Sequence, residues 1–194
     1  AEPAEGRMNA MTTAEAMAMF AGMSDAQKAA YDELLTAGRP VWVPQQGPQY
    51  SAYHSKADIL FYGGAAGGGK SSMMLGLALT KHSRSIIFRR EAVQLTGLEE
   101  DMSRILGSRT GYNSTTGVWR LPGDRVMELG SVAQPDDWQK YQGRAHDLKC
   151  FDELAHFTES QFRALIGWLR SDDPAQRQRV VCAGNPPTDA SGEW

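Results

Sequence analysis

Cysteine is scarce in this sequence. Its 194 residues include only Cys150 and Cys182, and each lies within a short apolar run. Two cysteines give no disulfide framework of the kind that stabilises small secreted domains, and their scarcity favours a reducing cytosol. We interpret both residues as small apolar side chains of buried strands.

Long apolar runs and an excess of one charge are also missing. No uninterrupted apolar stretch approaches the length of a membrane-spanning helix, and the N-terminus lacks the basic and apolar segments of a signal peptide, so no membrane association is expected. The net charge is −3, which excludes a basic field over the whole protein that would attract nucleic acid. Any contact with DNA must come from local basic groups, which the sequence does not localise.

What is present suits one sizeable folded domain. With 41% hydrophobic and 22% charged residues, the composition is that of a soluble globular protein. We expect residues 1–40 to form an N-terminal tail and helical segment, and residues 41–194 to form the core. Residues 44–48, rich in proline and glutamine, are expected to be an irregular loop. The spacing of a helical capping box occurs twice in the first segment, at Thr12 with Glu15 and at Ser24 with Gln27.

From residue 59 onward the pattern alternates between strands and helices. Strands separated by helices favour an α/β fold with a mostly parallel sheet and helices on both faces. Short apolar runs predict strands at residues 59–62, 86–88, 118–121, 126–129, 148–151 and 180–183, the third and fourth forming a β-hairpin. Helices are predicted at residues 72–80, at 95–106 and after Thr158, where Gln161 completes a capping box and Phe162, Leu165, Ile166 and Leu169 form a buried stripe.

A glycine-rich loop between the first of these strands and its helix carries the strongest functional signal. It fits the P-loop pattern, and a strand before it and a helix after it are the context that this pattern requires. Glycines let successive backbone N–H groups point inward and hold phosphate oxygens, while the helix adds the positive end of its dipole. We therefore expect nucleotide-binding residues at Gly64, Ala65, Ala66, Gly67, Gly68, Gly69, Lys70, Ser71 and Ser72.

The chemistry of the loop side chains indicates ATP with Mg²⁺ as the ligand. Lys70 would reach the β- and γ-phosphates, and the Ser71 hydroxyl would coordinate Mg²⁺. Asp152 and Glu153 directly follow the predicted strand at residues 148–151. In P-loop enzymes, an acid at the end of a neighbouring strand holds the Mg²⁺ shell, and a second acid can orient or deprotonate the attacking water. We expect Asp152 to hold the metal with Ser71, and Glu153 to be catalytic together with Lys70.

These features together resemble the ATPase domain of a tailed-bacteriophage large terminase subunit. Five segments carry the resemblance, and their combination is specific. They are residues 44–49 (PQQGPQ, similar to an adenine-recognition segment), 58–71 (Walker A), 88–90 (FRR, at the end of the second strand), 141–154 (leading to Walker B) and 184–187 (GNPP, similar to a coupling motif). The resemblance implies an ASCE, RecA-like P-loop NTPase fold with a small β-hairpin insertion.

As to function, the resemblance implies an ATPase motor that translocates double-stranded viral DNA into a procapsid in the cytoplasm of the host cell. Its partners would be DNA, the portal protein, the small terminase subunit, and further copies of this chain in a ring, expected to be a pentamer. Gln49 would hydrogen-bond the adenine edge, and Asn185 would sense the γ-phosphate and transmit hydrolysis to the rest of the domain.

An arginine that acts on the neighbouring subunit's ATP is expected in such rings, where it would stabilise charge on the transferring phosphoryl group. The sequence departs here from one version of the family, because the position that often carries this arginine is Gln142. Arg144 is our candidate for the catalytic role, with Arg89 and Arg90 as alternatives. Family members also continue into an RNase H-like nuclease, and no acid cluster for one follows the coupling motif, so no nuclease activity is expected of this chain.

Two other functions remain open from the sequence. A helicase-like DNA-dependent ATPase would also combine a glutamine loop, a P-loop and an Asp-Glu pair, but no second RecA-like lobe fits in this chain. A nucleotide-gated assembly module would bind ATP without hydrolysing it, and ATP turnover separates this module from both enzymes.

Overall fold

The computed structural model describes Thr12 and residues 21–25, 27–28, 40–64 and 67–186. The chain divides into two units, residues 1–40 and 41–194, and each is considered by itself. In the first unit, the Ser24 backbone N–H donates to Gln27 Oε1 at 2.9 Å and the Gln27 backbone N–H donates to Ser24 Oγ at 3.3 Å, which confirms the second capping box. The partner of Thr12 in the other box lies outside the described residues.

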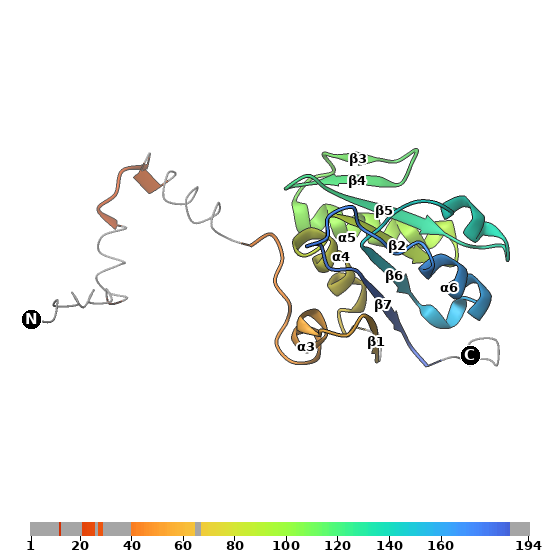
Figure 1. Ribbon diagram of the computed structural model, residues 1–194. Helices are drawn as coiled ribbons and strands as arrows, with labels where there is room; N and C mark the ends of the chain where they lie inside the picture. Colours follow the sequence, from red (N-terminus) through yellow and green to blue (C-terminus); the bar gives the residue numbers. More distant parts are fainter. Residues whose placement is uncertain (1–11, 13–20, 26, 29–39, 65–66, 187–194) are drawn as a thin grey trace, which may run out of the picture. The chain divides into compact units, whose positions relative to one another are not determined.

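A seven-stranded sheet forms the centre of the second unit (Figure 1). Its order is β1 (Ile59–Gly63), β7 (Arg179–Gly184), β6 (Leu148–Asp152), β2 (Arg84–Arg89), β5 (Arg125–Ser131), β4 (Val118–Leu121) and β3 (Tyr112–Asn113). The first five strands are parallel, whereas β4 and β3 are added antiparallel. The mostly parallel sheet is confirmed. The predicted β4–β5 hairpin is also present, and it extends the main sheet because β5 pairs with β2.

The helices of the second unit are α3 (Pro48–His54), α4 (Lys70–Thr80), α5 (Leu95–Leu106) and α6 (Glu159–Ile166), with short 3₁₀ segments η1 (Ala92–Gln94), η2 (Asp137–Tyr141) and η3 (Leu154–His156). Within the described part of the chain, no helix has the length and apolar character needed to span a membrane. The predicted irregular loop at residues 44–48 gives way to α3 at Pro48. Proline suits the first turn of a helix because its fixed φ is helical and its missing N–H is not needed there.

Two apolar clusters cover the two faces of the sheet. Helices α4 and α5 pack with Cys150 on one face, and α6 packs with Cys182 on the other. Both cysteines are free and buried, as expected. Burial raises the pKa of the Cys182 thiol to about 12 and that of the Cys150 thiol well above its usual value. The capping box at Thr158 is confirmed, but α6 ends at Ile166, and Leu169 instead forms a bridge to His146.

Helix α4 is apolar on most sides, as predicted for a helix packed against a sheet. Trp42 lies directly on it at Gly76, where an added Cβ would overlap the indole ring. The indole Nε1 also donates to Ser72 Oγ at 3.0 Å. A larger residue at Gly76 would displace Trp42, so this glycine lets the chain before α3 hold the helix that follows the glycine-rich loop.

Candidate nucleotide-binding site

The glycine-rich loop connects the end of β1 to the start of α4. Gly64, Gly67 and Gly69 have positive φ values of 144°, 84° and 69°, which glycine adopts without the penalty of a Cβ. Gly69 precedes α4, and no side-chain hydrogen bond caps the N-terminus of this helix. The first N–H groups of α4 are therefore available to an anion. Two positions of the predicted loop, Ala65 and Ala66, lie outside the described residues.

The Lys70 side chain reaches back to the first glycine of this loop. Its Nζ donates to the Gly64 carbonyl oxygen at 2.7 Å and to Asn185 Oδ1 at 3.0 Å. The side chain is largely buried, with 8% of the residue exposed. The ammonium group is thus held between the P-loop and the residue that follows β7, so two of the predicted site residues are brought into direct contact.

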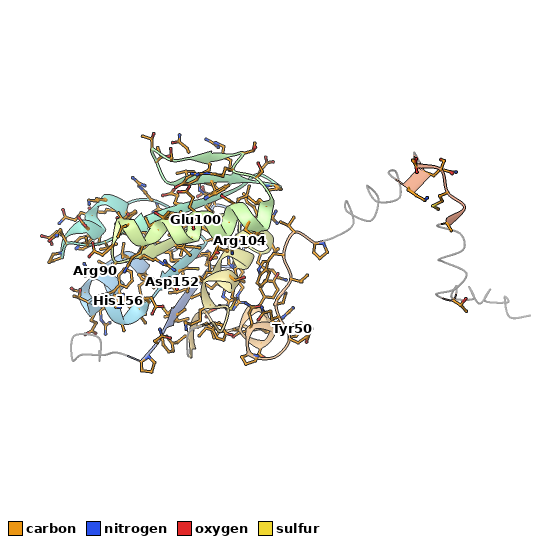
Figure 2. The ribbon with its side chains drawn as sticks, turned by 180° about the vertical axis from the view of Figure 1, so that it is seen from behind. Tyr50, Arg90, Glu100, Arg104, Asp152 and His156 are labelled. Carbon is orange, nitrogen blue, oxygen red and sulfur yellow. The ribbon has the colours of Figure 1, made fainter. Side chains whose placement is uncertain are left out.

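Ser71 meets Asp152 at the end of β6. Ser71 Oγ donates to Asp152 Oδ2 at 2.9 Å. Asp152, labelled in Figure 2, is only 1% exposed and thus buried in the domain. Its other oxygen, Oδ1, is buried and has no hydrogen-bond partner among the described residues. An unpartnered carboxylate oxygen beside a hydroxyl fits Mg²⁺, which proteins hold through one or two carboxylates while phosphates and water complete the shell.

Arg89 also binds Asp152, which the sequence did not predict. Its Nε and Nη2 donate to Asp152 Oδ2 at 2.9 and 2.6 Å, and its Nη1 donates to the Gln94 carbonyl oxygen at 2.6 Å. The next residue, Arg90, instead donates from Nη1 to Gln161 Oε1 at 2.8 Å. Both alternatives for the arginine that acts on a neighbouring subunit are therefore engaged within their own chain.

Glu153 occupies a strained backbone position. Its φ of 58° and ψ of 59° are left-handed, a conformation that costs a non-glycine residue about 1–2 kcal/mol. The Asn185 backbone N–H donates to Glu153 Oε2 at a long 3.4 Å. Strain of this kind persists where the surroundings over-determine it, and it clusters at functional sites. The turn carries the chain away from β6, so that Asp152 and Glu153 face different partners.

Part of this set lines one depression of about 340 Å³, together with Gly67, Gly68 and Gly69, whereas Asp152 lies behind Ser71 and is not among the lining residues. Lys70, Ser71, Glu153 and Asn185 all border it, and Ser72 does so as well. The depression also includes Asp101 of α5, which pairs with Arg104 at 2.8 Å. No local pattern indicated Asp101, because its place depends on how α5 packs over the sheet.

Two side chains hold the loop from outside. The Tyr62 hydroxyl donates to the Gly68 carbonyl oxygen at 2.9 Å, and Gln49 Nε2 donates to the Gly69 carbonyl oxygen at 2.9 Å. Gln49 is 3% exposed, and its Oε1 accepts from the Gln45 backbone N–H at 2.5 Å. The Gln49 amide, predicted to contact adenine, is thus bonded to the protein backbone at both of its ends.

Arg144 does not join this depression. It borders a second, larger one of about 620 Å³ that includes residues of β4 and β5. Arg144 Nη1 donates to Glu128 Oε2 at 3.1 Å, and the guanidinium carbon lies 5.6 Å from the centre of the Tyr141 ring. Burial raises the pKa of Glu128, but bonds and charge from His146 and Arg144 outweigh this and leave it lowered. Despite its size, this second depression lacks the glycine-rich loop and helix N-terminus that suit a phosphate chain.

The mostly parallel sheet, the glycine-rich loop after β1 and the acid at the end of β6 are those of the P-loop NTPase fold class. Several solved structures that this chain resembles in fold are bacteriophage large terminases. The large terminase of a thermophilic bacteriophage matches with a TM-score of 0.56 at 14% identity, over 75% of this chain and 40% of that chain. The same protein in complex with ADP matches with a TM-score of 0.52 at 15% identity, over 74% and 38%.

The large terminase of bacteriophage HK97 matches with a TM-score of 0.55 at 11% identity, over 77% of this chain and 34% of that chain. No protein-family model and no curated protein sequence matches. The chain spans 34–40% of the length of the chains in these three terminase structures. At this identity the likeness establishes the fold, and the expected structural resemblance to large terminases is confirmed.

Proposed function

We propose that this chain binds ATP with Mg²⁺ at the P-loop and hydrolyses it. The observation that carries the proposal is the meeting of Lys70, Ser71, Asp152 and Asn185 from three separate parts of the sequence. The ADP complex of the thermophilic phage's terminase supports the choice of an adenine nucleotide. Ser71 and Asp152 would hold the Mg²⁺, which, when bound, neutralises charge on the phosphates.

The residues of the candidate site then have defined tasks. Loop N–H groups and the start of α4 bind the phosphates, and Lys70 exchanges its bond to Gly64 for the β- and γ-phosphates. Glu153 orients the attacking water and accepts its proton. Gln49 contacts the adenine edge, which requires its Nε2 to leave the Gly69 carbonyl oxygen.

Asn185 is well placed to report the state of the nucleotide. It contacts Lys70 through its side chain and Glu153 through its backbone, at the point where the chain leaves β7. A γ-phosphate that attracts Lys70 would compete with the Asn185 contact. Loss of this contact would move the end of β7, which is how hydrolysis would be transmitted.

Arg144 would act on the ATP of a neighbouring copy. Its separation from its own P-loop depression and its exposed fraction of 54% are compatible with a role in a second copy of the chain. Its contacts with Glu128 and Tyr141 would hold the guanidinium ready for that contact.

The biological role that we propose is a large terminase motor that moves double-stranded DNA into a procapsid through the portal. The terminase fold supports this role. The test is to assay ATP hydrolysis and nuclease-protected DNA with portal-bearing procapsids, with procapsids lacking the portal, and with neither. We expect portal-bearing particles to raise turnover and to protect DNA. Turnover that responds to DNA but not to the portal would favour a helicase-like ATPase, and binding without turnover would favour an assembly module.

A further inference from the structure

We propose that Arg89 is a positioning residue of the magnesium site, which fixes the Asp152 carboxylate so that Oδ1 faces the metal. The inference rests on the proposed function, because it concerns how the same site holds Mg²⁺. It assigns Arg89 a task within its own subunit, in contrast to the action on a neighbouring subunit that the sequence left open.

The first argument is the unusual use of one carboxylate oxygen. An arginine fork commonly pairs with both oxygens of a carboxylate. Here Nε and Nη2 of Arg89 both donate to Asp152 Oδ2, at 2.9 and 2.6 Å, and Ser71 Oγ adds a third donor at 2.9 Å. A carboxylate oxygen has two lone pairs, so three donors leave Oδ2 no spare capacity. Oδ1 keeps its full capacity for the metal shell, and it is the buried atom without a partner among the described residues.

The second argument is charge. Asp152 is 1% exposed, and an ionised carboxylate at this depth is costly unless a cation accompanies it. Arg89, with 21% of its side chain exposed, supplies that cation at 2.6 Å. The carboxylate is therefore paired with a cation and oriented before Mg²⁺ and nucleotide arrive.

The third argument is that Arg89 is itself held in place. Its Nη1 donates to the Gln94 carbonyl oxygen at 2.6 Å, directly before α5. Gln94 is fixed in turn by a capping box with Glu91. A side chain that orients a metal ligand must be locked by its own partners, because a loose one would let the ligand rotate.

Arg90 provides a matched control on the same strand end. It carries the same side chain one residue later, but its Nη1 bonds Gln161 Oε1 at 2.8 Å. Arg90 and Asp152 are both labelled in Figure 2. Among the described residues, no hydrogen bond joins these two side chains. Replacement of either arginine removes one positive charge, but only replacement of Arg89 releases Asp152.

The experiment measures ADP binding to the whole chain in excess Mg²⁺ and in excess EDTA, for wild type, Arg89→Gln, Arg89→Lys and Arg90→Gln. The readout is the ratio of the Kd in EDTA to the Kd in Mg²⁺. Loss of a partner that orients a metal ligand typically weakens metal affinity by about 10–100-fold, so we expect this ratio to fall by about tenfold or more in Arg89→Gln. The Kd in EDTA should stay near the wild-type value, and Arg90→Gln should keep the wild-type ratio.

Arg89→Lys keeps the positive charge but not the two N–H donors that bind Asp152, so its ratio should also fall. If Arg89→Gln does not fold, this variant tests the inference instead. In an Asp152→Asn background, Arg89→Gln should have little further effect, because both changes remove the same oriented oxygen. A wild-type ratio in the folded Arg89 variants, or an equal fall in Arg90→Gln, would overturn the inference alone. Wild-type protein that binds no ADP in either condition would overturn the proposed function as well.

Discussion

Ser71 Oγ at the start of α4 donates a hydrogen bond of 2.9 Å to Asp152 Oδ2 at the end of β6. This contact joins the P-loop to the acid predicted to hold the metal. We expect Ser71→Ala to reduce the gain in ATP affinity that Mg²⁺ provides, by about tenfold, because a ligand of the metal and a partner of Asp152 are lost together. Equilibrium binding with and without Mg²⁺ measures this gain.

Ser72→Ala is the matched control for that change. The Ser72 hydroxyl accepts from Trp42 Nε1 at 3.0 Å, so its loss leaves the indole N–H without that acceptor. The cost should appear as about 1 kcal/mol of folding stability, with the Mg²⁺ dependence retained. Equal loss of Mg²⁺ dependence in both variants would contradict the assignment of Ser71 to the metal.

Glu153→Gln should separate nucleotide binding from hydrolysis. An amide cannot accept the proton of the attacking water, and loss of a general base typically slows a reaction by about 10²–10⁴-fold. The glutamine side chain has nearly the shape of glutamate, so the left-handed turn and the ATP affinity should be preserved. Single-turnover phosphate release and nucleotide binding measure the two properties. Turnover near that of wild type would contradict the role of Glu153 as the general base.

Arg144 can be tested by mixing two inactive variants. Arg144→Ala subunits keep an intact P-loop, and Lys70→Ala subunits keep Arg144. If Arg144 acts on a neighbouring copy, mixed rings contain interfaces with both intact groups, so hydrolysis should partly return. The measurement is ATP turnover as a function of the mixing ratio under conditions where the wild type hydrolyses ATP. No recovery at any ratio would indicate that Arg144 acts only within its own subunit or not at all.

Lys149 makes stability depend on pH in an alkaline window. It is fully buried, and its Nζ donates to the Leu165 carbonyl oxygen at 2.5 Å. Burial, with the nearby charge of Arg170, lowers the pKa of Lys149 to about 8. In the unfolded chain its pKa is about 10.4. The unfolded state therefore binds more protons between these values, and the contribution of Lys149 to the free energy of unfolding rises with pH.

Lys149→Met keeps an unbranched side chain that is one heavy atom shorter, and it removes this dependence. The quantity to follow is the free energy of unfolding of the wild type minus that of the variant. This difference should rise by up to about 3 kcal/mol from about pH 7.5 to 10.5. Urea denaturation at several pH values measures the difference. The buried cysteines oppose this trend, because their raised pKa values make stability fall as pH rises, but they are present in both proteins and cancel. A difference that does not change with pH would contradict the assignment.

The sequence predicted the elements whose signals are local. Helix α5 and strand β4 have the predicted bounds, and the P-loop was predictable because a glycine pattern, a strand and a helix follow one another directly. The capping box at Thr158 was visible for the same reason. Helix α3 was missed because proline and glycine around residues 44–48 suggested a loop, although proline also starts helices.

The site was predictable only in part. Residue types and spacing indicated Lys70, Ser71 and Asp152, but not which atoms meet. The pair of Arg89 and Asp152 joins residues 63 positions apart, and the sequence carries no pattern for such a contact. Asp101 enters the depression only through the packing of α5, and the hydrogen bonds of Gln49 depend on where α3 lies against the loop. These are tertiary relationships that a local pattern does not encode.

The most direct test of the central claim is calorimetric titration of ATP with Mg²⁺ into the wild-type chain and into Lys70→Ala. Lys70 borders the loop, and its ammonium is the cation assigned to the phosphates. We predict binding at one site in the wild type and a loss of affinity of about tenfold or more in the variant, since a hydrogen bond to a charged group contributes about 1.5–3 kcal/mol. Absence of binding to the wild type, or equal affinity in the two proteins, would contradict a nucleotide site at this loop.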